Sequence, residues 1–121
     1  MRIELFYTPG CPNRALALER IRTALQSLGI TEAVAMTVVA SYAEAERLEC
    51  PGSPTVRVNG ADVDPEARTA HIYGLACRLY AGGGTREGAP PVAMIAQAIL
   101  GAGPGPARRS GQTAAEEESD S

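Results

Sequence analysis

Apolar side chains change their spacing twice before residue 40, and this change constrains the fold more than any other feature. The run Ile3–Tyr7 is short and partly alternates, which is typical of a β-strand. A stripe with helical spacing follows, formed by Leu18, Ile21, Leu25 and Leu28. Residues 34–39 are almost all apolar, as in a strand covered on both faces. The pattern therefore predicts a strand, a helix and a second strand.

A second helix and a third strand are predicted next. Ser41 and Glu44 have the spacing of a capping box, which indicates a short helix that extends to Leu48. Residues 55–58 alternate and run into the Asn59-Gly60 turn, so we expect a strand there. This gives the order β-α-β-α-β for the first half of the chain.

The second half predicts a loop, a strand and a last helix. Residues 61–73 are polar and lack a period, and the Asp62 and Asp64 pair predicts an Asx-type turn rather than a metal site. Residues 75–80 are expected to form the fourth strand. Pro90-Pro91 begins a helix that Gly101 ends.

These elements predict an α/β domain over residues 1–102 with the order β-α-β-α-β-β-α. We expect a central mixed sheet of about four strands, flanked by helices. The first strands, joined through helices, should be parallel with right-handed crossovers, and the last two should form an antiparallel edge. Residues 103–121 are rich in Gly, Pro and Ala and end in acidic residues, which predicts a disordered acidic tail.

Charge and cysteine content limit the classes of partner. The chain has 11 basic residues, all arginine, and 14 acidic ones, giving a net charge of −3. No basic stripe is evident, which argues against nucleic acid as a partner. No apolar run approaches the ~20 residues that cross a membrane, and no signal peptide is recognised. Three cysteines in such a chain favour free thiols and a cytoplasmic location.

The chemistry of the chain is expected at Cys11, which follows the first strand in the segment Tyr-Thr-Pro-Gly-Cys-Pro. Pro12 suits the first turn of a helix, so Cys11 would lie at or beside the N-cap. The unpaired amides and partial positive charge of a helix N-terminus favour a thiolate there, and Arg14 adds a permanent cation. A thiolate attacks disulfides and binds soft metals.

The element order, with Cys11 after the first strand and Ser53-Pro54-Thr55 at the start of the third, resembles the thioredoxin-like superfamily, most closely its glutaredoxin-like members. The likeness spans about residues 2–100. It implies thiol-disulfide exchange or mixed-disulfide formation through Cys11, assisted by Arg14. It also implies a cis bond before Pro54 and a Ser53 backbone that pairs with an extended substrate or a glutathionyl group. The substrate-binding residues would be Pro12, Ser53, Pro54 and Thr55.

The site departs from the dithiol members of that family, because Arg14 replaces the second cysteine of the C-x-x-C motif. A mixed disulfide on this monothiol Cys-Pro-Asn-Arg site is then resolved by glutathione or by another cysteine, or the protein does not turn over. Cys50, on a loop expected near Cys11, is one candidate for the second thiol. Cys77 is another, although the predicted hairpin places it away from Cys11 unless the 61–73 loop folds back.

Glutathione is the candidate co-substrate, and no resident cofactor is predicted. The glycines at 82–84 match the position where glutaredoxins hold glutathione, but the acidic match after them is weaker. The implied partner is a thiol or disulfide, either a small molecule or a protein.

Two other functions stay open. The segment 74–78 resembles a group of small thioredoxin-fold proteins, some named for organomercurial lyase. Cys11, Cys50 and Cys77 would then supply soft-metal thiolates for mercury, arsenic or copper(I). The third function is a non-catalytic thioredoxin-fold module that binds a protein partner in its groove. The fold alone does not choose among these functions.

Overall fold

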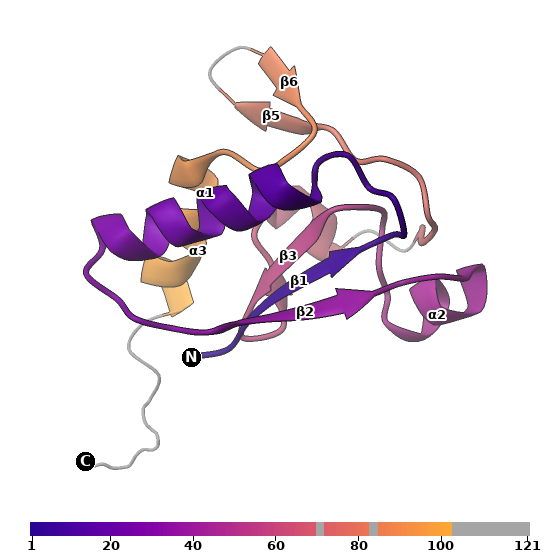
Figure 1. The fold of residues 1–121 in the computed structure, drawn as a ribbon, viewed down its shortest axis with the longest axis horizontal. Coiled ribbons are helices and arrows are strands. Elements are labelled where there is room, and N and C mark those ends of the chain that lie inside the picture. The colour runs from indigo at the N-terminus through magenta and orange to yellow at the C-terminus, as the bar shows by residue number, and fades with distance from the viewer. Residues whose placement is uncertain (70–71, 83–84, 103–121) are drawn as a thin grey trace.

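The computed structural model describes residues 1–69, 72–82 and 85–102 (Figure 1). The predicted tail, residues 103–121, lies outside the described residues. The described chain has an α/β fold whose main sheet contains four strands in the order β2-β1-β3-β4. These strands are β1 (Ile3–Tyr7), β2 (Val34–Val38), β3 (Thr55–Val58) and β4 (Ala61–Asp62).

The sheet is mixed, as predicted. Strand β1 runs parallel to β2, with Leu5 opposite Met36, and antiparallel to β3, with Leu5 opposite Val56. The expectation that helix-linked strands are parallel holds for β1 and β2. It is wrong for β3, which pairs on the other side of β1 and runs in the opposite direction.

Helices α1 (Arg14–Ser27) and α3 (Val92–Ala102) lie side by side over one face of this sheet, and α2 (Tyr42–Arg47) lies beyond the end of β2 (Figure 1). The capping box of α2 is confirmed. The Glu44 amide donates to Ser41 Oγ at 3.2 Å, and the Glu44 carboxylate accepts from the Ala40 amide at 2.8 Å. In the part of the chain that the structure describes, no helix is long and apolar enough to cross a membrane.

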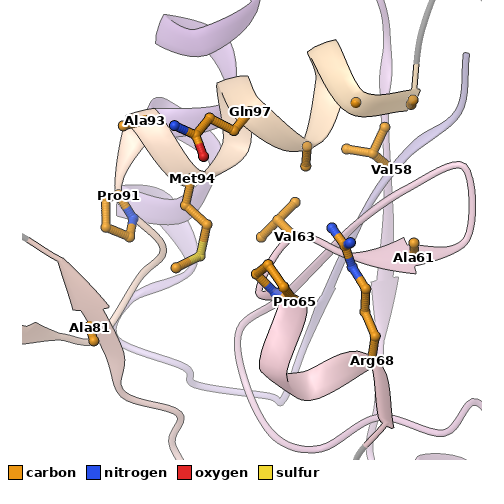
Figure 2. Close-up of a pocket in the computed structure, with 13 residues that line it drawn as sticks. Val58, Ala61, Val63, Pro65, Arg68, Ala81, Pro91, Ala93, Met94 and Gln97 are labelled. Carbon is orange, nitrogen blue, oxygen red and sulfur yellow. The ribbon is translucent and has the colours of Figure 1, made fainter.

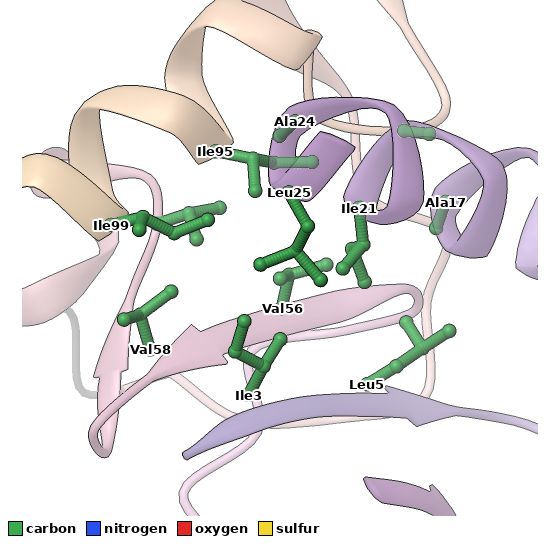
Figure 3. Close-up of a cluster of buried hydrophobic side chains, with 12 residues drawn as sticks. Ile3, Leu5, Ala17, Ile21, Ala24, Leu25, Val56, Val58, Ile95 and Ile99 are labelled. Atoms are coloured by element: carbon green, nitrogen blue, oxygen red, sulfur yellow. The ribbon is translucent and has the colours of Figure 1, made fainter. Parts of the chain in front are cut away.

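The main core lies between these two helices and the sheet. Figure 3 shows Ile21 and Leu25 of α1 and Ile95 of α3 directed at side chains of β1 and β3. Burying each such side chain stabilises the fold by about 1.5–3 kcal/mol. The predicted stripe of α1 is rotated slightly, because Leu18 is only half-buried and packs at the edge of the core. The fully buried stripe of α1 consists of Ala17, Ile21, Ala24 and Leu25.

The fourth strand is not where the sequence predicted it. Asn59 and Gly60 both have positive φ, of 53° and 87°, which suits a tight two-residue hairpin. The chain therefore returns at once as β4, inside the predicted 61–73 loop, and then forms the 3-10 helix η1 (Pro65–Thr69). Residues 75–79 are not a strand. Tyr80 instead begins a separate hairpin of β5 (Tyr80–Gly82) and β6 (Thr85–Glu87).

Strand β2 is also less covered than its apolar sequence predicted. It is the edge strand of the sheet, and none of its residues is fully buried. Met36 is 38% exposed and Val38 is 45% exposed. The continuous apolar run therefore reflects an edge strand with exposed apolar side chains, and the expectation of cover on both faces is wrong.

Candidate functional site

Cys11 lies at the end of a tight turn that follows β1. Its amide donates to Thr8 O at 3.1 Å, and Gly10, the third residue of the turn, has a φ of 74°. A proline followed by a glycine with positive φ is the signature of a type II turn. Cys11 as a residue is half-buried.

The helix begins later than the sequence predicted. Asn13 is the N-cap of α1 and Arg14 its first residue, so Cys11 precedes the N-cap by two residues and Pro12 lies outside the helix. The reason is that Cys11 closes one turn with Thr8 and accepts from the Arg14 amide, at 3.4 Å, in a second. The Asn13 side chain makes no capping bond.

A hydrogen bond joins this turn to the start of β3. The Thr8 amide donates to Ser53 Oγ at 3.0 Å. The Ser53–Pro54 peptide bond is cis, as the resemblance predicted. Of the predicted substrate-binding residues, Ser53 is 2% exposed, and Pro54 and Thr55 are also buried, whereas Pro12 is exposed. The structure therefore brings the turn of residues 8–11 (the Cys11 turn) next to residues 53–55 (the Ser53 loop). The side chains of the Ser53 loop face inward.

The backbone of Ser53 is already paired within the chain. Its amide donates to Ala76 O at 2.9 Å, and its carbonyl accepts from the Arg78 amide at 2.9 Å. This bonding forms a parallel bridge in which Ser53 lies opposite Cys77. The segment 74–80 thus occupies the backbone groups that the resemblance assigns to a substrate, and an extended substrate would have to displace it.

Polar side chains also attach the segment 74–80 to this loop. The Arg78 guanidinium donates to Asp62 Oδ2 at 2.7 Å and to Thr55 Oγ1 at 3.2 Å, and it lies 4.4 Å from the centre of the Tyr80 ring. The Tyr80 hydroxyl donates to Pro54 O. Burial raises the pKa of Tyr80, so the hydroxyl stays protonated and remains a donor. The sequence did not indicate these contacts, because their partners are far apart in the chain.

The Asx-type turn is confirmed, since the Asp64 amide donates to Asp62 Oδ1 at 2.9 Å. The same carboxylate pairs with Arg78, and both side chains are nearly buried, at 6% and 9% exposed. Asp62 therefore combines a local turn with a long-range ion pair. Only the first of these could be inferred from neighbouring residues.

The three cysteines are free thiols in different environments. Cys50 is 1% exposed and belongs to a small apolar cluster with Phe6, Val39 and Ala45. Burial raises its pKa and favours the neutral thiol. Cys77 is exposed, and it lies opposite Ser53 rather than at the far end of a hairpin. The expected placement of Cys77 away from the site is therefore wrong, because residues 75–79 do not form the hairpin strand.

The other predicted site features surround the start of α1. Arg14 is exposed, and its guanidinium carbon lies 5.2 Å from the centre of the Tyr7 ring. Glu87, the acidic residue after the glycine run, is ion-paired with Arg20 of α1. Of the glycines predicted to hold glutathione, 83 and 84 lie outside the described residues.

A separate pocket of about 580 Å³ lies between α3 and the segment from β4 to η1. Figure 2 shows Met94 of α3 directed towards Val63 and Pro65. Its described lining residues include Arg68 but no cysteine, histidine or acidic side chain. Within residues 1–69, 72–82 and 85–102, no group of three or more histidine, cysteine, aspartate or glutamate residues could hold a metal ion. None of the three cysteines therefore lines this pocket.

The site lies on an α/β fold with a mixed four-stranded sheet. This fold is compatible with a thioredoxin-like arrangement. Among the cysteines, Cys11 is half-buried, Cys77 is exposed and Cys50 is enclosed. No protein-family model, curated protein or solved structure matches the chain.

Proposed function

We propose that this chain is a thioredoxin-like thiol-disulfide exchange protein that reacts through Cys11. The observation that carries the proposal is the position of a half-buried cysteine on a turn that is hydrogen-bonded to the Ser53 loop. In the reaction, the Cys11 thiolate attacks one sulfur of a disulfide. A new bond joins Cys11 to that sulfur, and the other sulfur leaves as a thiolate.

A permanent cation and the start of a helix both lie near this turn in the chain. Arg14 follows Cys11 by three residues, and its guanidinium is held over the Tyr7 ring. The Asn13 side chain accepts no hydrogen bond from the first amides of α1. Cationic groups and helix N-termini both stabilise a thiolate relative to a thiol.

Consumption of oxidised glutathione by the reduced full-length chain tests the proposal. We expect release of reduced glutathione at neutral pH, and a rate slower by on the order of tenfold in Cys11→Ser. Cys50→Ala is the matched control, since that thiol is enclosed, and it should react like the unmodified chain. Equal rates for Cys11→Ser and the unmodified chain, or no reaction in either, would contradict the proposal.

A second candidate function is the binding of a soft metal ion by the same accessible thiols. The exposure of Cys77 opposite Ser53 favours it, because two thiolates suffice for mercury(II) or copper(I). Retention of mercury(II) through gel filtration would be lost in both Cys11→Ser and Cys77→Ser. Such retention without consumption of oxidised glutathione would favour this function over exchange.

A further inference from the structure

Cys77 is held at the same end of the sheet as Cys11 by a short series of hydrogen bonds. Cys11 donates to Thr8, Thr8 donates to Ser53, and Ser53 forms the bridge with Cys77. Figure 1 shows the loop between β1 and α1 and the segment that leads into β5 at this end. Two accessible thiols therefore lie on adjoining segments of the chain.

The bridge also fixes the register and direction of Cys77. Both neighbours of Cys77 are bonded to the same residue, Ala76 through its carbonyl and Arg78 through its amide. A shift by one residue would turn every side chain of the segment to the opposite side. Residues paired directly across two strands project to the same side, and on that side Ser53 Oγ accepts from the Thr8 amide.

Close packing holds the segment in this register. A Cβ atom built on Gly52 would lie 2.6 Å from Ala76 O and 2.7 Å from Arg78 Cγ. The Gly74 amide donates to Cys50 O at 3.0 Å, and the Arg78 guanidinium pairs with Asp62. Cys77 itself remains exposed between these attachments. Its sulfur is thus accessible although its backbone is fixed.

We infer that Cys77 is the resolving thiol of Cys11, an assignment that rests on the proposed function. The Cys11 thiolate first attacks oxidised glutathione, forms a mixed disulfide and releases one glutathione thiolate. The Cys77 thiolate then attacks the Cys11 sulfur, and the bond to the glutathionyl sulfur breaks. The protein dithiol is oxidised to a Cys11–Cys77 disulfide, and one oxidised glutathione is reduced to two thiols. The two protons lost by the cysteines pass to the glutathione thiolates.

Cys77 would take the role of the second cysteine that the Cys-Pro-Asn-Arg motif lacks, because Arg14 stands at that position. Cys50 is a poor alternative, because it is 1% exposed and burial raises its pKa. A disulfide needs Cα atoms within about 7 Å. The Thr8–Ser53 hydrogen bond and the Ser53–Cys77 bridge link the two cysteine segments, and the assignment requires Cys11 and Cys77 to come within that distance.

Peptide mapping of the full chain tests the assignment. The chain has no lysine, and trypsin cleavage at arginine places the three cysteines in separate peptides, residues 3–14, 48–57 and 69–78. After reaction with oxidised glutathione and acid quenching, we expect peptide 3–14 linked to 69–78 in the unmodified chain and in Cys50→Ala. In Cys77→Ser, peptide 3–14 should instead carry a glutathionyl group, and glutathione release should fall by half.

Each other outcome overturns the assignment in a recognisable way. If peptide 3–14 stays glutathionylated in the unmodified chain as it does in Cys77→Ser, Cys77 does not resolve Cys11, although the exchange function stands. A link between 3–14 and 48–57 would assign that role to Cys50. If Cys11 does not react in any variant, the proposed function fails as well.

Discussion

Helix α3 and the segment 74–80 are attached to neighbouring parts of the chain by different forces. Ile95 and Ile99 hold α3 to the sheet by apolar burial, in a core shared with Val56 and Val58 (Figure 3). The segment 74–80 is held at the start of β3 by backbone hydrogen bonds, by the Arg78–Asp62 ion pair and by the Tyr80 hydroxyl. Apolar burial of Leu75 and of the Tyr80 ring adds to these polar contacts.

The difference matters for the chemistry of the site. Apolar packing is proportional to the area removed from water and is not directional, so it tolerates small changes of position. Hydrogen bonds require a specific alignment of donor and acceptor. Polar attachment therefore suits a segment that must place one residue, Cys77, opposite Ser53 while the thiol stays exposed. Two variants of the polar attachment and one of an apolar cluster test this contrast.

The largest expected effect is that of Arg78→Leu. It leaves the nearly buried carboxylate of Asp62 without its cation, so the free energy of unfolding should fall by about 3–5 kcal/mol in urea denaturation. Arg22→Leu, on the exposed face of α1, is the matched control and should change stability by at most about 0.5 kcal/mol.

The double variant Arg78→Leu with Asp62→Leu sharpens the same test. Replacing both members of a buried ion pair by apolar side chains is often neutral, so the double variant should recover most of the lost stability. If Arg78→Leu alone is as stable as Arg22→Leu, the ion pair does not hold the segment. The contrast between polar and apolar attachment would then be wrong.

Gly52→Ala should have the next largest effect. The new Cβ would meet Ala76 O and Arg78 Cγ at under 3 Å, at a φ of 154° that disfavours a side chain. We expect a loss of at least about 2 kcal/mol, from strain and overpacking together. Gly101→Ala is the matched control, since its Cβ meets nothing within 4 Å in α3, and it should stabilise the chain by about 0.5–1 kcal/mol.

Native-state trypsin digestion gives a second readout for Gly52→Ala. The Arg78 side chain is 9% exposed and its amide is bonded to Ser53, so cleavage after Arg78 should be slow in the unmodified chain. Release of the segment should increase cleavage there. Equal cleavage in Gly52→Ala and Gly101→Ala would mean that the segment keeps its place despite the added methyl group.

The same contrast explains how much of the molecule could be predicted from its sequence. The stripe around Ile21 and the capping box at Ser41 and Glu44 are local patterns, and the structure confirms the helices they predict. The fourth strand was misplaced, although Asn59-Gly60 gave the signal for a tight hairpin. The second strand of that hairpin has only two residues, too few to show a period.

The candidate site was predictable only where its signals are local. The turn signal of Thr8-Pro9-Gly10 before Cys11 comes from adjacent residues. The cis bond before Pro54 was implied by the family resemblance, and the structure confirms that bond. The attachment of the segment 74–80 joins Arg78 to Asp62 and Tyr80 to Pro54, across 16 and 26 positions. No periodic pattern encodes such pairs. The predicted hairpin therefore placed Cys77 away from Cys11 unless the 61–73 loop folded back, whereas the structure pairs Cys77 with Ser53.

The smallest expected effect concerns the second apolar cluster, around Cys50, where burial outweighs the neighbouring groups that favour the thiolate. Burial raises the pKa of Cys50 in the folded chain above its ordinary value of 9.0. Above that pH the unfolded chain loses this proton before the folded chain does. The contribution of Cys50 to the free energy of unfolding is therefore fully present below pH 9.0 and is lost as the pH rises. The loss is at most about 1.4 kcal/mol per pH unit.

Cys50→Ala should remove this loss, whereas Cys77→Ala, at an exposed thiol, should retain it. Urea denaturation at about pH 8 and about pH 10 measures the difference between the two variants. Burial also raises the pKa of Tyr80 above its ordinary value of 10.0, so Tyr80 adds a loss of the same sign near pH 10. Both variants keep Tyr80, so this loss cancels when they are compared. An unchanged pH dependence in Cys50→Ala would show that the Cys50 cluster admits water. Cys50 would then be an alternative to Cys77 for the proposed resolving role, because the reactivity of a thiol follows its thiolate fraction and its access to solvent.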